Sequence, residues 1–309
     1  MKRTTIDAVI PVYKPPKEFK KLIRILELQK IKIRNIYLMH TEDGTDLTRL
    51  DFLKKYDNII IKEIKLGEFD HGGTRDAAFR LSDAEYVLCM TQDAVPMDAS
   101  LTEKLLDGMK DEKVAVAYAR QLPKKECNLT ERFIRSFNYP KESVLKTKAD
   151  LGTLGVKTYF CSNVCALYRR DIYIEQGGFE KRIIISEDMM YAASCIHNGY
   201  KILYAASAEV LHSHNYTNKE QFHRNFDIGV SQAQHAEIFF GIKSESEGIR
   251  MIKRAIVYMI KNGHLLAVIE LFTSSMAKYL GYFLGKNYRQ LPKKMILCCT
   301  MNPQYWNRS

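Results

Sequence analysis

The sequence lacks the marks of a secreted or membrane-spanning protein. Its seven cysteines are an odd number without framework spacing, so they fit a reducing compartment better than a disulfide scaffold. The N-terminus has no apolar signal-peptide core, and no clean apolar run reaches the ~20 residues that a spanning helix needs. We therefore expect a folded cytoplasmic protein.

No nucleic-acid-binding signature accompanies the basic charge of the chain. The formal net charge is +11 over 309 residues, and residues 243–309 carry eleven lysines and arginines against three glutamates. Such an excess suits nucleic acid or an anionic membrane surface. Because neither a helix-turn-helix pattern nor an aromatic RNA-binding motif is present, we expect no nucleic-acid partner.

Strand and helix patterns alternate along the first half of the chain. Strand-forming residues predominate at 5–13, 35–39, 58–64, 85–90 and 114–119. Apolar residues recur at helical spacing between some of these segments. This order predicts βαβ units whose parallel strands end at one edge of a sheet, and the 46% hydrophobic content agrees with one large or two moderate α/β domains.

One predicted buried strand ends in a carboxylate. Residues 85–90 lead directly into Gln92 and Asp93. Ligands bind at this end of the strands in open α/β sheets, and a carboxylate there can hold Mg²⁺ or Mn²⁺ against a diphosphate. The alternative is an aspartate that starts a turn before Pro96.

Two further loops of the first half carry polar side chains. The acidic loop after the second strand includes Thr41 and Asp43, which could accept hydrogen bonds from a ribose or a base. Alternatively, this loop caps the next helix. Two glycines open the helix that follows the third strand, and helix N-termini favour phosphate. Arg75 and Asp76 would face the same ligand one turn later, and His71 is clustered with them.

The middle of the chain is harder to interpret. Residues 122–158 are polar and basic, and we expect them to form a long acceptor-side lid. Strand character returns at 159–168. Within it, Ser162 and Asn163 are either pocket lining or hydrogen-bonded core.

Paired acids and paired histidines follow. Glu187 and Asp188 open a predicted helix after the N-cap residue Ser186, where the helix dipole stabilises acids. The alternative to this local role is a general base. Short strands at 201–204 and 208–211 lead into His212 and His214, which share a face and can act together on a metal or a phosphate.

The C-terminal region has an amphipathic pattern. Residues 249–260 and 265–284 mix aliphatic and aromatic residues with lysine and arginine, which suits helices lying in a membrane interface. The alternative is a helical subdomain that packs on the catalytic core or on a second subunit. Arg224, on a helix before this region, could reach an anionic leaving group.

Taken in series, these motifs resemble the inverting family 2 glycosyltransferases with a GT-A fold, and within them the rhamnosyltransferase-like branch. The likeness spans roughly residues 5–230. The residues that carry it are Val9 to Tyr13, Thr41 to Asp46, Phe69 to Arg75, Thr91 to Ala94, Ser162 and Asn163, Glu187 and Asp188, and His212 to Tyr216.

The resemblance implies a fold and a domain organisation. It implies a Rossmann-like mixed sheet flanked by helices, with a catalytic domain at 1–240. Residues 1–120 would bind the nucleotide sugar and residues 121–240 the acceptor. Residues 241–309 would form basic amphipathic helices in contact with a membrane or another subunit.

The resemblance also implies roles for individual residues. Asp188 is similar to the catalytic base of the family's ED motif, with Glu187 beside it. Asp93 is similar to the last acid of the DXD motif, although Thr91 stands in place of the first acid, which makes His212 or His214 an additional ligand for Mn²⁺ or Mg²⁺. Donor-binding residues would be Pro11, Tyr13, Thr41, Asp43, His71, Arg75, Gln92 and Arg224, and acceptor-pocket residues Ser162 and Asn163.

The implied activity is the transfer of a sugar from a nucleotide-sugar donor, with inversion, in cell-surface polysaccharide synthesis. By resemblance the donor is dTDP-L-rhamnose and the acceptor a lipid-linked or other saccharide, used by an enzyme peripheral to the inner face of the cell membrane. Asn225 stands where processive members have tryptophan, which argues against synthesis of a long polymer. Alternatives are another hexosyl or galactofuranosyl transferase, and a non-catalytic scaffold.

Overall fold

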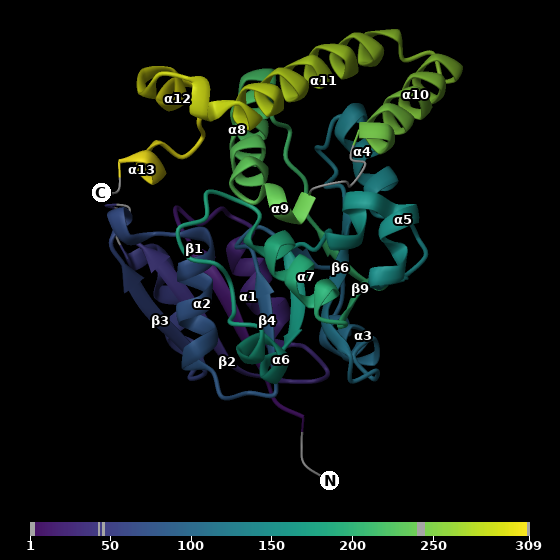
Figure 1. The fold of residues 1–309 in the computed structure, drawn as a ribbon. Coiled ribbons are helices and arrows are strands. Elements are labelled where there is room, and N and C mark those ends of the chain that lie inside the picture. Colours follow the sequence, from purple (N-terminus) through teal and green to yellow (C-terminus); the bar gives the residue numbers. More distant parts are fainter. Residues whose placement is uncertain (1–3, 43, 45–46, 240–244, 308–309) are drawn as a thin grey trace.

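The computed structural model describes residues 4–42, 44, 47–239 and 245–307 (Figure 1). These residues form one mixed sheet of nine strands in the order β3-β2-β1-β4-β8-β6-β9-β5, with β7 paired to β9. The strands are β1 Ile6–Val12, β2 Ile33–Thr41, β3 Ile59–Ile64, β4 Tyr86–Met90, β5 Val95–Pro96, β6 Val114–Leu122, β7 Val144–Lys146, β8 Cys165–Arg169 and β9 Lys201–Leu211.

Helices cover both faces of the sheet. They are α1 Phe19–Glu27, α2 His71–Leu81, α3 Leu101–Asp107, α4 Leu129–Asn138, α5 Leu151–Leu154, α6 Arg170–Glu175, α7 Glu187–His197, α8 Asn218–Gln234, α9 Ala236–Phe239, α10 Glu245–Lys261, α11 Leu265–Lys286, α12 Lys293–Cys299 and α13 Pro303–Trp306.

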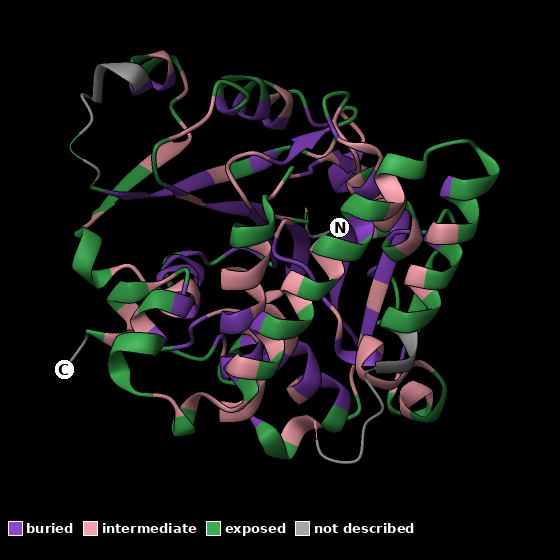
Figure 2. Cartoon of the chain, turned by 90° about the horizontal axis from the view of Figure 1, so that it is seen from above, coloured by how far each residue is buried: buried purple, intermediate pink, exposed green. Residues whose placement is uncertain are grey.

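The central strands are buried on both faces, which explains their continuous apolar sequences. Successive residues of β1 alternate between the two cores. Ile10 packs with α1 and α3 on one face, and Val9 packs with α2, α6 and α7 on the other. Figure 2 shows these buried strands in the interior with partly exposed helices around them.

The strand pairing brings together the polar segments that follow several strands. Strands β1, β2, β3 and β4 are mutually parallel, so their carboxyl ends meet at one edge of the sheet. Strand β8 runs antiparallel between β4 and β6, while β9 runs parallel to β6. The short strand β5 then pairs Val95 with Leu211, which places the residues after β4 beside the residues after β9.

Three sequence-based expectations for the middle of the chain are wrong. Residues 122–158 are not a long irregular lid, because Asn128 caps α4 and β7 pairs with β9. Strand β8 begins only at Cys165, after a turn that uses the polar residues 162 and 163. The two predicted strands after residue 200 are one strand, β9, whose pairing with β6 shifts register beyond Ala205.

The C-terminal helix α11 packs closely against α8. Gly281 and Gly285 of α11 face the backbone carbonyls of Phe222 and Phe226 on α8, and a Cβ at either glycine would collide with them. Helix α11 crosses the top of the molecule in Figure 1, and α12 and α13 then return toward the edge of the sheet. Of the helices described, none combines the length and the apolar character needed to cross a bilayer. The predicted domain boundary at residue 240 lies outside the described residues.

Candidate active site

Three potential metal ligands meet at the edge of the sheet. Asp93 follows β4, whereas His212 and His214 follow β9, and the β5–β9 pairing joins the two segments. The Nε2 atom of His214 lies 3.1 Å from Oδ2 of Asp93, and that of His212 lies 3.5 Å from the same oxygen. The two Nε2 atoms are 3.1 Å apart. These three residues are therefore brought together as the sequence predicts.

The hydrogen bond on the far side of His212 fixes its tautomer. Its Nδ1 lies 3.0 Å from Oε1 of Gln121, which can only accept, so Nδ1 carries the proton and the Nε2 lone pair faces Asp93. Burial lowers the pKa of His212 to about 3 and keeps the ring neutral. Two imidazoles and one carboxylate fit a divalent cation such as Mn²⁺. Gln121 lies near the end of an apolar strand, and no signal in the sequence marks it.

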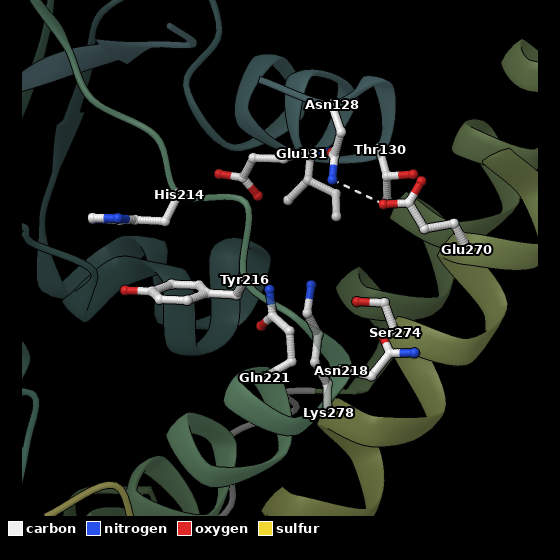
Figure 3. A pocket seen from close by; sticks show the side chains of 11 residues that line it. Asn128, Thr130, Glu131, His214, Tyr216, Asn218, Gln221, Glu270, Ser274 and Lys278 are labelled. Carbon is white, nitrogen blue, oxygen red and sulfur yellow. Dashed lines mark hydrogen bonds between the residues drawn. The ribbon is translucent and has the colours of Figure 1, made fainter. Parts of the chain in front are cut away.

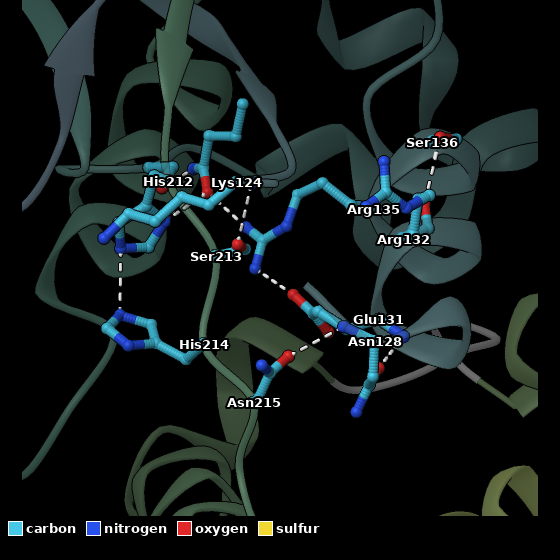
Figure 4. A network of polar contacts seen from close by, with 12 residues as sticks. Lys124, Asn128, Glu131, Arg132, Arg135, Ser136, His212, Ser213, His214 and Asn215 are labelled. Carbon is cyan, nitrogen blue, oxygen red and sulfur yellow. Dashed lines mark hydrogen bonds and ion pairs between the residues drawn. The ribbon is translucent and has the colours of Figure 1, made fainter. Parts of the chain in front are cut away.

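Hydrogen bonds hold the histidine segment against the start of α4 (Figure 4). The Ser213 hydroxyl accepts from the backbone N–H of Lys124 at 3.0 Å. The Asn215 side chain accepts from the backbone N–H of Asn128 at 3.0 Å. Arg135 of α4 donates both to Glu131 and to the Gln121 oxygen that His212 uses. The position of His212 therefore depends on α4 as well as on β9.

The acid pair at the start of α7 is held by α2 and by Asn163. Arg75 Nη1 lies 3.0 Å from Oε1 of Glu187, and Asn163 Nδ2 donates to the same oxygen at 2.9 Å. The backbone N–H of Asn163 donates to Oδ2 of Asp188 at 2.9 Å. Ser186 is not the side-chain N-cap that the sequence predicts, since it makes no cap hydrogen bond and adopts φ +74°.

The two neighbouring carboxyls have opposite pKa shifts. Burial and the charge of Glu187 raise the pKa of Asp188 above its ordinary value. Burial acts in the same sense on Glu187, but the charges of Arg75 and His71 and the hydrogen bond from Asn163 together outweigh it and lower the pKa of Glu187. Asp188 is thus the better proton acceptor at neutral pH, while Glu187 serves as the ionised partner of Arg75.

Residues 162 and 163 connect the acid pair to the histidine cluster. The Ser162 hydroxyl accepts from Nε2 of Gln121 at 2.9 Å, and the same Gln121 side chain contacts His212. The Asn163 amide is bonded to Glu187 and to the Tyr168 hydroxyl. Both Ser162 and Asn163 are buried in these contacts. Their predicted acceptor contacts therefore remain predictions.

A separate open pocket of about 380 Å³ lies beside this edge of the sheet. Three predicted donor-binding residues line it, namely Tyr13, Thr41 and His71. The buried Thr41 hydroxyl has no hydrogen-bond partner within the described part of the chain, so it is available to a ligand. Burial lowers the pKa of His71, which favours its neutral form.

The remaining predicted donor-binding residues lie elsewhere or outside the description. Gln92 is committed to the backbone of Tyr13, since its Nε2 donates to the carbonyl at 2.7 Å and its Oε1 accepts from the N–H at 3.0 Å. Arg224 lies over the ring of Tyr216, which stacks on His214 with centroids 5.0 Å apart. Pro11 belongs to β1, opposite Met39. Asp43 lies outside the described residues.

The far side of the 380 Å³ pocket is formed by the end of the chain, which sequence reasoning missed. Residues 301–305 line it, and we call residues 300–305 the C-terminal wall. The buried carboxylate of Asp227 on α8 anchors this wall. It accepts from the Thr300 hydroxyl at 2.6 Å, the Met301 N–H at 3.0 Å and the Asn302 amide at 3.0 Å.

Residues 7–177 match the family model described as Glycosyl transferase family 2. The chain belongs to this family. It is 39% identical over 287 residues to the O-antigen chain rhamnosyltransferase RfbN of Salmonella typhimurium, with 91% of this chain and 90% of RfbN covered. It is 40% identical over 268 residues to the O-antigen chain rhamnosyltransferase WbaN of Salmonella anatum, with 85% and 84% covered.

Solved structures confirm the predicted GT-A fold. The mannosyltransferase PcManGT of Pyrobaculum calidifontis, in complex with GDP-Man and Mn²⁺, superposes with a TM-score of 0.58 at 13% identity. The comparison covers 98% of this chain and 83% of PcManGT. Residues 1–349 of Staphylococcus aureus TarS give a TM-score of 0.53 at 14% identity over 93% and 92% of the two chains. This glycosyltransferase therefore has the fold that its motifs predict.

Proposed function

We propose that the protein transfers L-rhamnose from dTDP-L-rhamnose to a saccharide acceptor during cell-surface polysaccharide synthesis, with inversion at the anomeric carbon. The observation that carries this proposal is the identity of about 40% with two O-antigen chain rhamnosyltransferases over most of the chain. The acid pair and the metal-ligand cluster supply the groups that such a transfer needs.

The reaction is a single displacement in which Asp188 is the base. Asp188 takes the proton of an acceptor hydroxyl as that oxygen attacks the anomeric carbon, and the bond from this carbon to the nucleoside diphosphate breaks. The raised pKa of Asp188 makes it a stronger base than an exposed aspartate. Its neighbour Glu187 stays ionised against Arg75 and holds the start of α7 in place.

Asp93, His212 and His214 would hold Mn²⁺ or Mg²⁺. Such a cation stabilises the charge that develops on the leaving diphosphate, by about 4 kcal/mol at 4 Å from one phosphate charge and an effective dielectric near 20. Gln121 keeps the His212 lone pair directed at this position, and Tyr216 holds Arg224 beside it. The C-terminal wall and Thr41 would enclose the nucleotide.

We also propose that the acceptor is lipid-linked and that the enzyme binds an anionic membrane surface through α10 and α11. The exposed apolar residues of α11 recur every three or four positions along one face, at Leu265, Ile269, Phe272, Met276, Tyr279 and Phe283. Residues 245–307 carry nine lysines and arginines against three glutamates. A second copy would bring the same positive charge, so charge favours an anionic bilayer over a homodimer as the covering partner.

The membrane proposal is tested with lipid vesicles. The full chain should sediment with vesicles that contain anionic lipid and not with neutral vesicles. Phe272→Ser should weaken this binding, because it removes a large apolar side chain from the exposed face. Equal sedimentation with both vesicle types, or a stable dimer at all concentrations, would contradict the proposal.

The activity is tested with a panel of nucleotide sugars, with Mn²⁺ and with a chelator. We expect dTDP-L-rhamnose to be turned over in preference to other donors, only in the presence of a divalent cation, and product NMR to show an inverted anomeric configuration. Asp188→Asn should abolish turnover. Preference for another donor, or retained turnover by Asp188→Asn, would refute the respective parts of the proposal.

A further inference from the structure

Helix α11 turns a polar stripe toward the catalytic domain. Glu270, Ser274 and Lys278 are spaced four residues apart and therefore lie on one face of the helix. All three line a pocket against α4 and α8, while the opposite face of α11 exposes large apolar side chains such as Phe272 and Tyr279, and Leu271 is buried beside the stripe. An amphipathic helix attached to a protein usually buries its apolar face. A polar stripe on the inner side, next to the buried Leu271, suits a polar ligand there.

The inner pocket adjoins the metal-ligand cluster (Figure 3). It is a shallow depression that is open to solvent, and its inner part of about 20 Å³ has room for about one water-sized group, such as a single hydroxyl. Thr130 and Glu131 come from α4, His214 and Tyr216 from the segment after β9, and the three polar residues of the stripe from α11. We call this depression the polar recess. A ligand in it would lie directly beside His214.

Two groups in the polar recess have no partner among the residues that the structure describes. One is the buried hydroxyl of Thr130. No hydrogen bond or ion pair reaches Lys278 Nζ from the residues that the structure describes, and burial lowers its pKa. The other charged groups are already engaged, since Asn128 donates to Glu270 at 2.8 Å and Arg135 pairs with Glu131. The buried, unpaired hydroxyl of Thr130 costs about 1–3 kcal/mol, which a bound ligand would recover, whereas Lys278 is only half-buried.

The charges of the recess favour a neutral ligand over an anion. Two carboxylates, Glu131 and Glu270, line it with the single ammonium of Lys278. A diphosphate would be placed close to both carboxylates, whereas sugar hydroxyls can accept from Lys278 and Thr130 and also donate to carboxylate and amide oxygens. The ring of Tyr216 adds a flat surface at the side of His214.

We propose that the polar recess is part of an acceptor subsite, in which one hydroxyl of a neutral sugar unit of the acceptor glycan enters the recess while the ring lies over its open mouth, with Lys278 and Thr130 as the specificity-determining residues. This proposal rests on the proposed glycosyl transfer. It gives the C-terminal helix α11 a direct part in acceptor binding, in addition to its exposed face.

The test uses the full chain and measures binding without turnover. Methyl glycosides of glucose, galactose, mannose and rhamnose serve as probes in saturation-transfer NMR, with inorganic pyrophosphate as the anionic probe. At least one glycoside should bind, and Lys278→Met and Thr130→Val should each weaken its affinity about tenfold, the effect of one hydrogen bond. Thr273→Val, on the same helix but outside the recess, is the matched control and should bind like the parent protein.

The outcomes separate this proposal from the proposed function. If glycosides bind equally to all variants, or if only pyrophosphate binds and Lys278→Met abolishes that binding, the sugar subsite is refuted. Because the NMR measurement needs no donor, it remains informative even if dTDP-L-rhamnose proves not to be the donor. With an active donor, Lys278→Met should raise the KM for the acceptor more than it lowers kcat.

Discussion

The Nδ1–H of His212 donates to the side-chain oxygen of Gln121 at 3.0 Å. This contact determines which ring nitrogen faces Asp93, and the same amide continues through its nitrogen to Ser162, the neighbour of Asn163. One side chain in β6 therefore connects the metal-ligand cluster to the segment that holds the acid pair. Its loss should affect both.

Replacing Gln121 tests this connection. Gln121→Leu removes the acceptor of the Nδ1–H, so the affinity for Mn²⁺ should fall about 10–100-fold. Gln121→Glu keeps an acceptor oxygen and can pair with Arg135, so its Mn²⁺ affinity should stay close to the parent value. Titration followed by electron paramagnetic resonance measures both. Equal affinity in the leucine variant would show that Gln121 does not orient His212.

The acid pair predicts two opposite effects on stability. The pKa of Asp188 is raised by folding, so its ionisation destabilises the protein as the pH rises above the unfolded value of about 3.9. The free energy of unfolding of Asp188→Asn should therefore exceed that of the parent at pH 8 by at least about 1.4 kcal/mol, the equivalent of one pKa unit. At pH 4 the variant should show no gain in stability. Its catalytic activity should nevertheless be lost.

The stability contribution of Glu187 should have the opposite pH dependence to that of Asp188. The pKa of Glu187 is lowered by folding, so its stabilising contribution is present above the unfolded value and is lost as the pH falls through the lowered folded value. Glu187→Gln leaves Arg75 buried without its charged partner and should cost about 3–5 kcal/mol at pH 8. Thermal unfolding at both pH values measures this. If the two variants shift stability in the same direction at pH 8, the assigned charge states are wrong.

The C-terminal wall predicts an effect on donor binding far from the acid pair. Asp227→Ala removes the acceptor of three hydrogen bonds to residues 300–302 and should raise the KM for the donor at least tenfold, with a smaller change in kcat. Cys298→Ser, an exposed change just before the wall, is the control. An unchanged donor KM in Asp227→Ala would remove the wall from the nucleotide site.

The glycine contacts between α8 and α11 predict a steric effect. A Cβ at Gly285 would collide with the carbonyl of Phe226, so Gly285→Ala should destabilise the protein by about 1–3 kcal/mol. Gly248 lies in α10 with open space around it, so Gly248→Ala should stabilise by up to about 1 kcal/mol. Denaturant titrations compare the two. Equal effects would mean that α11 does not pack closely on α8.

Sequence patterns predicted those elements of the fold that depend on a short stretch of neighbouring residues. The apolar runs of β1, β2 and β4 and the i, i+2 histidines could be located because each pattern is short and the strand ends fix where the side chains lie. The role of Gln121 could not be predicted from the sequence, because it arises only when β6 and β9 pair. Residues 122–158 were misjudged because short capped elements have little periodicity.

The C-terminal region shows the same limit. The sequence predicted that α11 is amphipathic, but not which face is turned inward, since that depends on backbone contact through Gly281 and Gly285. Likewise, nothing in residues 300–305 predicts a place beside Thr41, because the anchor is a carboxylate more than seventy positions earlier, Asp227.

Helix α8 holds both late segments of the chain, through Asp227 at the C-terminal wall and through its glycine-lined contact with α11. Shortening the protein after α9 to obtain a smaller catalytic fragment would thus open the 380 Å³ pocket, our proposed nucleotide site, on one side and dismantle the polar recess on the other. Expression designs for this enzyme should keep the chain through α13 and adjust solubility by substitutions on the outer face of α11.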